Sequence, residues 1–227
     1  MASCLITGCS RGLGLELTKQ LSSQPAVDSS NGRINFVLLD VAKEDSIAAA
    51  VLEVTQILGA GNGLDLLINN AGIQILEQNG VTGLHALTES FDVNVIAVHN
   101  VSVGFLPLLS SSRQKKLVII TSELGSITNT AIFSTAPFPS YKVSKAAVNM
   151  LMAQYAMELG PKGFTVFAIN PGWLSTDMGG SQANLEPVVG ACQVVEIIQK
   201  ATPADNGSFR QIYVEGWDVY DGKNIPW

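Results

Sequence analysis

A tyrosine and a lysine lie one helical turn apart in the run YKVSK. In a helix, the four-residue spacing of Tyr141 and Lys145 places both side chains on one face. A phenol with a pKa of about 10 is a weak acid at neutral pH, but a neighbouring ammonium group stabilises the phenolate and lowers that pKa. The pair is a candidate proton donor, although a surface Tyr–Lys pair is the simpler interpretation when the motif stands alone.

Three glycines follow the first strand-like run, in LITGCSRGLGLEL. Gly8, Gly12 and Gly14 lie between an apolar run and a helical pattern. A glycine turn at a helix N-terminus lets the backbone approach a pyrophosphate and offers it free N–H groups. The spacing is T-G-x-x-x-G-x-G rather than G-x-G-x-x-G. Its position between a strand and a helix nevertheless indicates a dinucleotide-binding turn.

Polar residues end two further apolar runs. Ser122 ends KLVIITS, and a hydroxyl at the carboxyl end of a parallel strand lies where ligands bind in open α/β sheets. It is a candidate for holding a substrate carbonyl oxygen, and Ser126 is a second, less favoured candidate. The run DLLINNAGI is apolar until two amides and a small-residue turn finish it at 69–72. This pattern predicts a buried strand with a polar group at its end.

Strand-like and helix-like runs alternate along the chain. The expected strands are 3–7, 34–41, 64–72, 116–122, 164–172 and 210–222. The expected helices begin at the glycine turn and end near Ser22, then cover 44–58, 84–110 (ended near Pro107), 141–159 and 186–200. Such alternation over one span predicts an α/β fold, a doubly wound parallel sheet in a single Rossmann-like domain over 1–227.

The composition excludes several kinds of partner. Of the 227 residues 47% are hydrophobic and 14% charged, and the formal net charge is −6. Without a basic block, nucleic acid and anionic membrane are poor partners. No apolar run reaches about 18 residues and the N-terminus does not resemble a signal peptide, so we expect no membrane helix. Three cysteines and two histidines match no metal site and suit a reducing, cytoplasmic setting.

The chain resembles the short-chain dehydrogenase/reductase family. The matching segments occur in the family's order and cover nearly the whole chain. They are TGCSRGLG (7–14), LDV (39–41), NNAG (69–72), Asn94 in FDVNV, Ser122, YKVSK (141–145) and NPGWLSTDM (170–178). Within the family, NPGWLSTDMGG, the ending YDGKNIPW and the long stretch between Ser122 and Tyr141 are similar to the C-factor/sniffer type of carbonyl reductase.

The resemblance implies a set of catalytic roles. Tyr141 would be the general acid that protonates a carbonyl oxygen as hydride arrives. Lys145 would hold the nicotinamide ribose and lower the pKa of Tyr141. Ser122 would orient the substrate, and Asn94 would hold a water that links Lys145 to solvent.

The resemblance also implies a set of cofactor contacts. The glycine turn would meet the pyrophosphate, the end of 64–72 and the LDV segment would meet the adenosine, and the turn after 164–170 would meet the nicotinamide amide. These contacts would come from Gly8, Ser10, Arg11, Gly12, Leu13, Gly14, Asp40, Val41, Asn70, Ala71, Gly72, Tyr141, Lys145, Pro171, Gly172, Leu174 and Thr176.

One departure from the family concerns the adenosine side. Only about a dozen residues separate the first helix from the run at 34–41, whereas a crossover with its helix needs at least roughly 10–12 residues by itself. The family's second strand and following helix are therefore missing. We hypothesise that 34–41 pairs directly with the first strand, which gives six main strands and leaves no unpaired backbone between them.

The same loss affects the choice of cofactor, because the missing segment normally grips the adenine ribose and its 2′-substituent. Arg11 remains in the glycine turn, where it would meet a 2′-phosphate through charge-assisted hydrogen bonds. We therefore expect NADP(H), with NAD(H) as the second choice. Arg33 is a candidate stand-in for the lost basic residue, although a solvated loop charge is the simpler interpretation.

Together these features predict an NADPH-dependent carbonyl reductase acting on small or aromatic ketones, aldehydes or quinones. The short, weakly charged stretch after Trp173 favours an apolar pocket. The alternative is a catalytically weak or inactive splice-type variant that binds dinucleotide poorly and acts as a binding or regulatory protein. Helices 84–110 and 141–159 would suit a homodimer in either case. Tyr213, Trp217 and Tyr220 either cap the substrate cleft or pack against the sheet edge.

Overall fold

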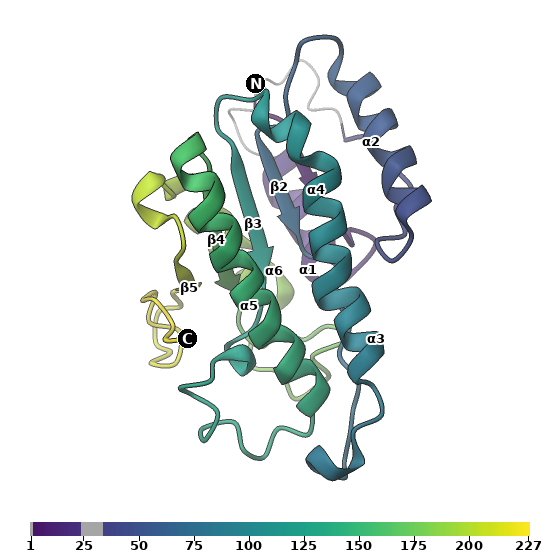
Figure 1. Cartoon of the computed structure of the whole chain (residues 1–227). Helices are drawn as coiled ribbons and strands as arrows, with labels where there is room; N and C mark the ends of the chain where they lie inside the picture. The colour runs from purple at the N-terminus through teal and green to yellow at the C-terminus, as the bar shows by residue number, and fades with distance from the viewer. Residues whose placement is uncertain (1, 24–33) are drawn as a thin grey trace.

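The described part of the chain, residues 2–23 and 34–227 of a computed structural model, is built on a parallel sheet (Figure 1). Five strands follow the order β1-β2-β3-β4-β5 within this part. They are β1 (Cys4–Ile6), β2 (Leu66–Asn69), β3 (Lys116–Ile120), β4 (Thr165–Asn170) and β5 (Phe209–Gln211). β2 and β4 are buried along their whole length, as expected for parallel strands covered on both faces.

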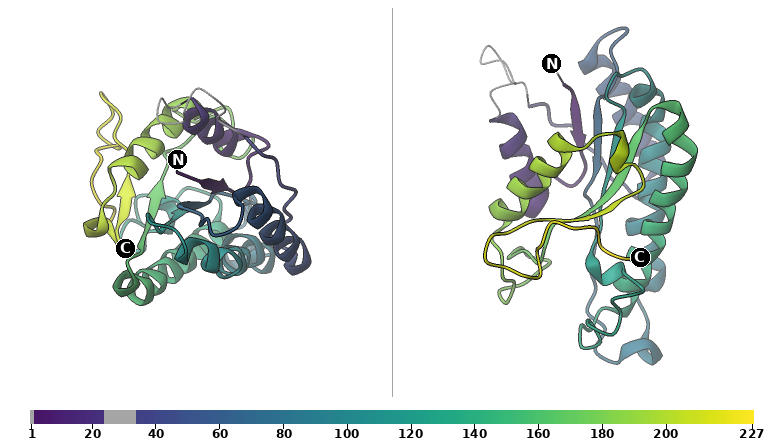
Figure 2. Two further views of the ribbon diagram at one scale, coloured as in Figure 1. Left: turned by 90° about the horizontal axis from the view of Figure 1, so that it is seen from above. Right: turned by 90° about the vertical axis from the view of Figure 1, so that its left-hand side faces the viewer.

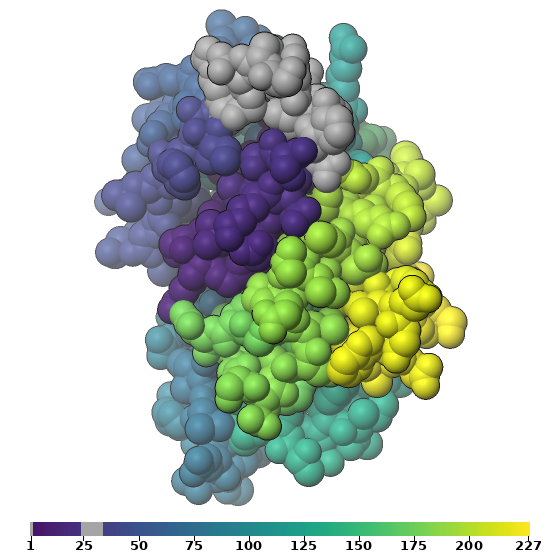
Figure 3. All heavy atoms as spheres, turned by 180° about the vertical axis from the view of Figure 1, so that it is seen from behind, coloured from purple at the N-terminus to yellow at the C-terminus, as the bar shows by residue number. Residues whose placement is uncertain are grey.

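Helices cover both faces of the sheet (Figure 2). α1 (Gly12–Ser22) and α6 (Pro187–Lys200) pack together on one face, and α2 (Glu44–Leu58), α4 (Ala97–Ser110) and α5 (Pro139–Leu159) cover the other. Figure 3 shows α1 against α6 on the face seen from behind. Each layer closes its own apolar cluster against the sheet. The predicted doubly wound single domain is confirmed.

The predicted helix over 84–110 is interrupted. It consists of α3 (Leu87–Phe91), a π-helical turn (Asp92–Ile96) and α4, which continues past Pro107 to Ser110. A π turn accommodates one extra residue, and here it contains Asn94, whose side chain bonds to another segment. By length and composition the run Leu87–Ser110 would also suit a membrane span. Val101, Phe105 and Leu109 lie in the core, however, as in the core helix of a globular domain.

The hypothesis that 34–41 pairs with β1 is wrong. Residues 34–40 have no regular secondary structure and form no ladder with β1 among the described residues, and β1 lies at the sheet edge. Val37, Leu39 and Val41 pack against the cluster that contains α2. On the other side of the segment, Phe36 is 85% and Leu38 91% exposed.

The physical reason for this placement is the attachment of the segment to α2. The Asp40 N–H donates to the Ser46 hydroxyl, and the Asp40 carboxylate accepts from the Ala42 N–H and pairs with Lys43. A shift towards β1 would break these bonds and withdraw Val37 and Leu39 from the core. The sheet therefore has five strands in the described part rather than six.

The last expected strand, 210–222, is mostly not a strand. β5 ends at Gln211, and the chain then turns back so that the Gln211 N–H donates to the Lys223 carbonyl and the Ile225 N–H donates to the Phe209 carbonyl. The tail therefore covers the β5 edge of the sheet, as the right-hand view of Figure 2 shows. Edge strands that are covered in this way are protected from pairing with another chain.

The placement of 34–41 predicts that leucine-to-alanine substitutions at two positions will differ in their effect on the free energy of unfolding. Leu38→Ala should change the free energy of unfolding by no more than about 0.5 kcal/mol, because the side chain is solvated. Leu67→Ala, at a residue with 0% exposure, should lower it by about 2–5 kcal/mol, because it leaves a cavity in the core. Urea unfolding of the cofactor-free protein measures both. A large loss in Leu38→Ala would mean that 34–41 packs in the interior.

Candidate functional site

The glycine turn between β1 and α1 is tightly packed. Gly8 and Gly12 have φ angles of 72° and 55°, a region that favours glycine. A Cβ on Gly14 would lie 2.2 Å from the Gly8 carbonyl oxygen. Ser10 and Arg11 lie in the same turn, and Leu13 is the second residue of α1, which begins at Gly12. The first turn of such a helix presents free N–H groups. The turn therefore has the shape and the donors that a pyrophosphate requires.

The amides at the end of β2 brace this turn. The Asn70 Nδ2 donates to the Thr7 and Gly8 carbonyls, at 2.9 and 3.2 Å. In return, the Thr7 hydroxyl accepts from the Asn70 and Ala71 N–H groups, both at 3.0 Å. Asn69 points the other way and donates to the buried Ser102 hydroxyl of α4. The amides thus fix neighbouring elements, and Thr7 is a positioning group that the sequence interpretation did not single out.

A hollow of about 640 Å³ opens beside the turn, and we call it the adenosine-side hollow. Its lining residues are Gly8, Leu38, Leu39, Asp40, Val41, Lys43, Ser46 and Ala71. A hydrogen bond from Lys43 lowers the pKa of Asp40. Asp40, Val41 and Ala71 were predicted on the adenosine side and Gly8 at the pyrophosphate. Leu39 belongs to the matching LDV segment, whereas Leu38, Lys43 and Ser46 were not predicted as cofactor contacts. The hollow is continuous with the glycine turn, so the residues present fit the adenosine half of a dinucleotide.

Tyr141 and Lys145 lie together on the buried side of α5, as their spacing predicted. The Lys145 Nζ lies 5.5 Å from the Tyr141 ring centroid and donates to the Ile120 carbonyl at the end of β3, at 3.0 Å. Burial lowers the pKa of Lys145 to about 8. Burial also raises the pKa of Tyr141 to about 12, although a hydrogen bond with Ser122 lowers it. In the chain by itself the pKa of this phenol is therefore raised, contrary to the lowering expected from the neighbouring lysine.

Asn94 joins this centre from the π turn. Its Oδ1 accepts from the Ile73 N–H at 2.9 Å, and its Nδ2 donates to the Ile73 carbonyl at 2.9 Å and to the Ser144 hydroxyl at 3.0 Å. The Ser144 hydroxyl donates to the Tyr141 carbonyl. A Cβ on Gly72 would lie 3.1 Å from Asn94 Oδ1 and 3.8 Å from Lys145 Nζ. Gly72 therefore keeps space open beside both side chains.

The segment after β4 folds over the glycine turn. It begins with Pro171 and with Gly172 at a φ of 85°. Thr176 lies against the turn, since a Cβ on Gly12 would be 3.3 Å from its methyl group. Leu174, which bridges to Leu185, lies in the same segment. The predicted pyrophosphate and nicotinamide contacts thus face one another.

An exposed ion pair links the glycine turn to the segment after β4. Arg11 Nη1 lies 2.8 Å from Asp177 Oδ2, and both side chains are about three-quarters exposed, at 76% and 75%. The guanidinium is therefore accessible to an incoming phosphate. The other predicted basic candidate, Arg33, lies outside the described residues.

The tail aromatics separate into two groups. Tyr220 is buried, and its hydroxyl accepts from the Trp173 N–H at 3.0 Å and donates to Asn184 Oδ1 at 2.8 Å. It therefore packs in the interior and holds the segment after β4. Tyr213 and Trp217 remain exposed.

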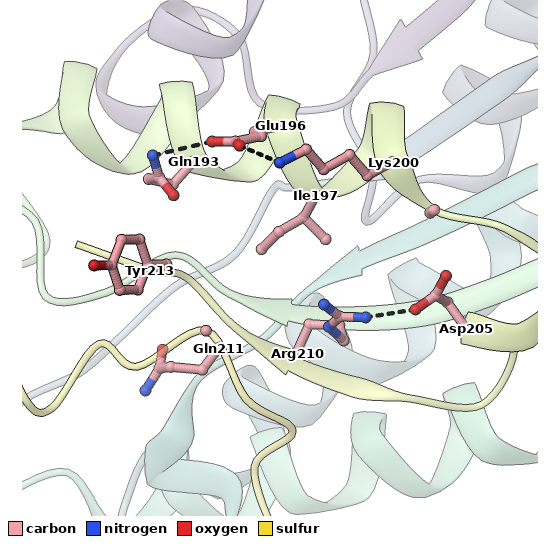
Figure 4. Close-up of a pocket in the computed structure, with 10 residues that line it drawn as sticks. Gln193, Glu196, Ile197, Lys200, Asp205, Arg210, Gln211 and Tyr213 are labelled. Carbon is pink, nitrogen blue, oxygen red and sulfur yellow. Dashed lines mark hydrogen bonds and ion pairs between the residues drawn. The ribbon is translucent and has the colours of Figure 1, made fainter. Parts of the chain in front are cut away.

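A second hollow, of about 310 Å³, lies between α6, β5 and the tail (Figure 4). Its charged side chains pair with one another, Lys200 with Glu196 and Arg210 with Asp205. Of the groups described above, only the exposed Tyr213 lines it, and it shares no lining residue with the glycine turn, the adenosine-side hollow or the Tyr141–Lys145 centre. It is therefore separate from the candidate site.

Comparisons with known proteins agree with this geometry. A family model described as short chain dehydrogenase matches residues 2–186. A short-chain dehydrogenase of Penicillium roqueforti is 31% identical over an alignment of 229 residues. The alignment covers 88% of this chain and 90% of that protein. An NADPH-bound carbonyl reductase from chicken fatty liver is 26% identical with a TM-score of 0.85, covering 100% of this chain and 98% of that one. The carbonyl reductase Sniffer of Drosophila melanogaster is 26% identical with a TM-score of 0.86, covering 100% of both chains.

Proposed function

The chain belongs to the short-chain dehydrogenase/reductase family of NAD(P)-dependent oxidoreductases, and on that basis we propose that it is an NADPH-dependent carbonyl reductase. One observation carries the proposal. Ser122, Tyr141 and Lys145 lie together in a buried centre. This centre and the glycine turn both lie at the carboxyl ends of the parallel strands. A carbonyl group at that centre would meet a proton donor and a second hydroxyl.

The residues of this chain would divide the work as follows. The Ser122 hydroxyl would hold the substrate carbonyl oxygen, and Tyr141 would give that oxygen its phenolic proton. Lys145 would bind the ribose hydroxyls and carry the charge that stabilises the phenolate. Asn94 would hold a water between Lys145 and solvent. Bound NADPH would supply the hydride.

The substrates would be small or aromatic ketones, aldehydes or quinones. The carbonyl reductases from chicken and Drosophila support a carbonyl substrate, and the half-exposed Trp173 that follows the Gly172 turn supports an apolar pocket. We propose a cytoplasmic location and one domain over 1–227 that carries both cofactor and substrate sites.

A weak or inactive variant is the competing interpretation, because the family's second strand and helix are missing. The adenosine-side hollow favours an active enzyme, since Leu38, Leu39 and Lys43 supply walls there without the lost segment. A fluorescence titration with NADPH separates the two. Binding followed by turnover of a carbonyl compound supports the enzyme, and no binding at millimolar cofactor favours the variant.

The substitution Tyr141→Phe tests whether Tyr141 is the general acid. Removing the phenolic proton should lower kcat by about 10²–10⁴-fold and leave the NADPH dissociation constant nearly unchanged. Tyr155→Phe is the matched control on the same helix, because the Tyr155 hydroxyl contacts His99 instead, and its kcat should equal that of the wild type. Steady-state kinetics with a quinone and a fluorescence titration give both quantities. Retained turnover in Tyr141→Phe would remove this residue from the acid role.

The accessible guanidinium of Arg11 predicts the cofactor preference. The wild type should bind NADPH more tightly than NADH, and Arg11→Ala should weaken NADPH binding by roughly tenfold, because a charge-assisted hydrogen bond to the 2′-phosphate is lost. Asp177→Asn keeps Arg11 and removes only its partner, so NADPH binding should not weaken. Titrations with both reduced cofactors decide the question. Tighter binding of NADH by the wild type would overturn the preference.

We also propose a homodimer through helices 84–110 and 141–159. Ile96, Val103, Met150 and Met157 are large apolar side chains on these helices that remain 47–69% exposed, which is typical of an interaction face. Met150→Glu should convert a dimer into a monomer in light scattering, because it places a charge on the buried face. Leu52→Glu on α2 is the control and should leave the dimer intact. A monomeric wild type would contradict the proposal.

A further inference from the structure

Glu77 is a buried carboxylate to which the chemistry above gives no role. It lies in the loop after β2 and is only 2% exposed. Its Oε1 accepts from the His85 N–H at 2.9 Å and from the Ala86 N–H at 3.1 Å. Its Oε2 accepts from the Ser140 N–H at 2.9 Å. Both oxygens are therefore bound to backbone amides of two distant segments.

The charge of this carboxylate is held by those amides. Burial acts to raise the pKa of Glu77, but the backbone hydrogen bonds from His85, Ser140 and Ala86 lower it to about 2. The nearest basic group recorded is the exposed His85 ring, whose Nδ1 lies 3.6 Å from Oε1. The carboxylate is therefore ionised at any working pH, and a buried anion with fixed donors has little freedom to move.

The three amides belong to the entrances of the helices that carry the catalytic groups. Ser140 is the second residue of α5 and immediately precedes Tyr141. His85 and Ala86 precede α3, which leads into the π turn with Asn94. Neither α3 nor α5 has a side-chain cap of its own, since Ala86 and Phe138 occupy the N-cap positions. Glu77 supplies from a distance the acceptor that a helix N-terminus lacks.

The loop of Glu77 is also tied to the centre at its other end. Ile73, four residues earlier, is held through both backbone groups by Asn94. The Glu77 N–H donates to the Pro137 carbonyl, just before α5. The loop therefore connects the entrance of α5 with the π turn. Within it, the Glu77 carboxylate binds the backbone at the start of α5 and the backbone just before α3.

We propose that Glu77 is a positioning residue for the catalytic centre, acting through Ser140 on Tyr141 and through the α3 entrance on Asn94. It fixes the first turn of α5, so that the phenol is aimed at the substrate carbonyl before substrate binds. This inference rests on the proposed reductase function. Small displacements of a reacting group lower turnover steeply, so the effect should appear in kcat rather than in cofactor binding.

The test compares Glu77→Gln with the wild type and with Glu158→Gln. The glutamine keeps the volume of Glu77 but turns an NH2 group towards a backbone N–H, which breaks at least one of the three bonds. Glu158, at the far end of α5, is exposed and paired with Lys162. Each protein is assayed with NADPH and phenanthrenequinone, titrated with NADPH by fluorescence, and checked for folding by circular dichroism and thermal unfolding.

We expect Glu77→Gln to be folded, to bind NADPH within about threefold of the wild type and to lose about tenfold or more in kcat, with a smaller change in KM. Glu158→Gln should match the wild type throughout. A folded Glu77→Gln with wild-type kcat overturns the proposal. If it does not fold, Glu77→Asp, which keeps the charge on a shorter side chain, replaces it. Failure of both to fold also overturns the proposal, because Glu77 is then only a stability residue. A wild type without turnover would instead refute the reductase function.

Discussion

Lys145 sits deep in the protein with its amine on the Ile120 carbonyl, and much of the architecture follows from that contact. For the amine to reach the end of β3, α5 must lie very close to the loop after Ser122. Gly125 permits this approach, since a Cβ there would be 2.7 Å from the Lys145 carbonyl carbon. Burial lowers the pKa of the amine to about 8 and raises the pKa of the phenol to about 12, so the phenol is neutral at neutral pH. A neutral phenol is the protonation state that a proton donor to a carbonyl oxygen requires.

Side-chain bonds to backbone hold the surrounding loops in register with this centre. Asn70 ties the end of β2 to the glycine turn, Asn94 ties Ile73 to the π turn, and Glu77 ties the same loop to the first turn of α5. Each replaces a backbone partner that an irregular segment cannot find in a ladder or helix. The loops after β1 and β2 and the entrance of α5 are therefore fixed by specific polar contacts.

The adenosine side of the candidate site has no strand beside β1 in the described residues. β1 is an edge strand there, α1 packs on α6, and Asn70 braces the glycine turn. The segment at 34–41 keeps its attachment to α2 because Val37 and Leu39 belong to that helix's apolar cluster. As a result, the side chains of Phe36 and Leu38, on the other side of this segment, face solvent. The adenosine-side hollow thus has one wall that includes the exposed Leu38.

The sequence by itself determined the alternation of elements, the glycine turn and the Tyr141–Lys145 pair, because periodicity and local spacing fix which residues share a face. Ser122 was proposed from its place at the end of a strand, and Asn94 and the NNAG segment from the resemblance to the family. Only the tertiary structure decided that 34–41 stays away from β1, that 84–110 contains a π turn and that Glu77 joins two helix entrances. These features depend on contacts between residues far apart in the chain. Glu77 and Ser140 are 63 positions apart, and local pattern carries no information at that separation.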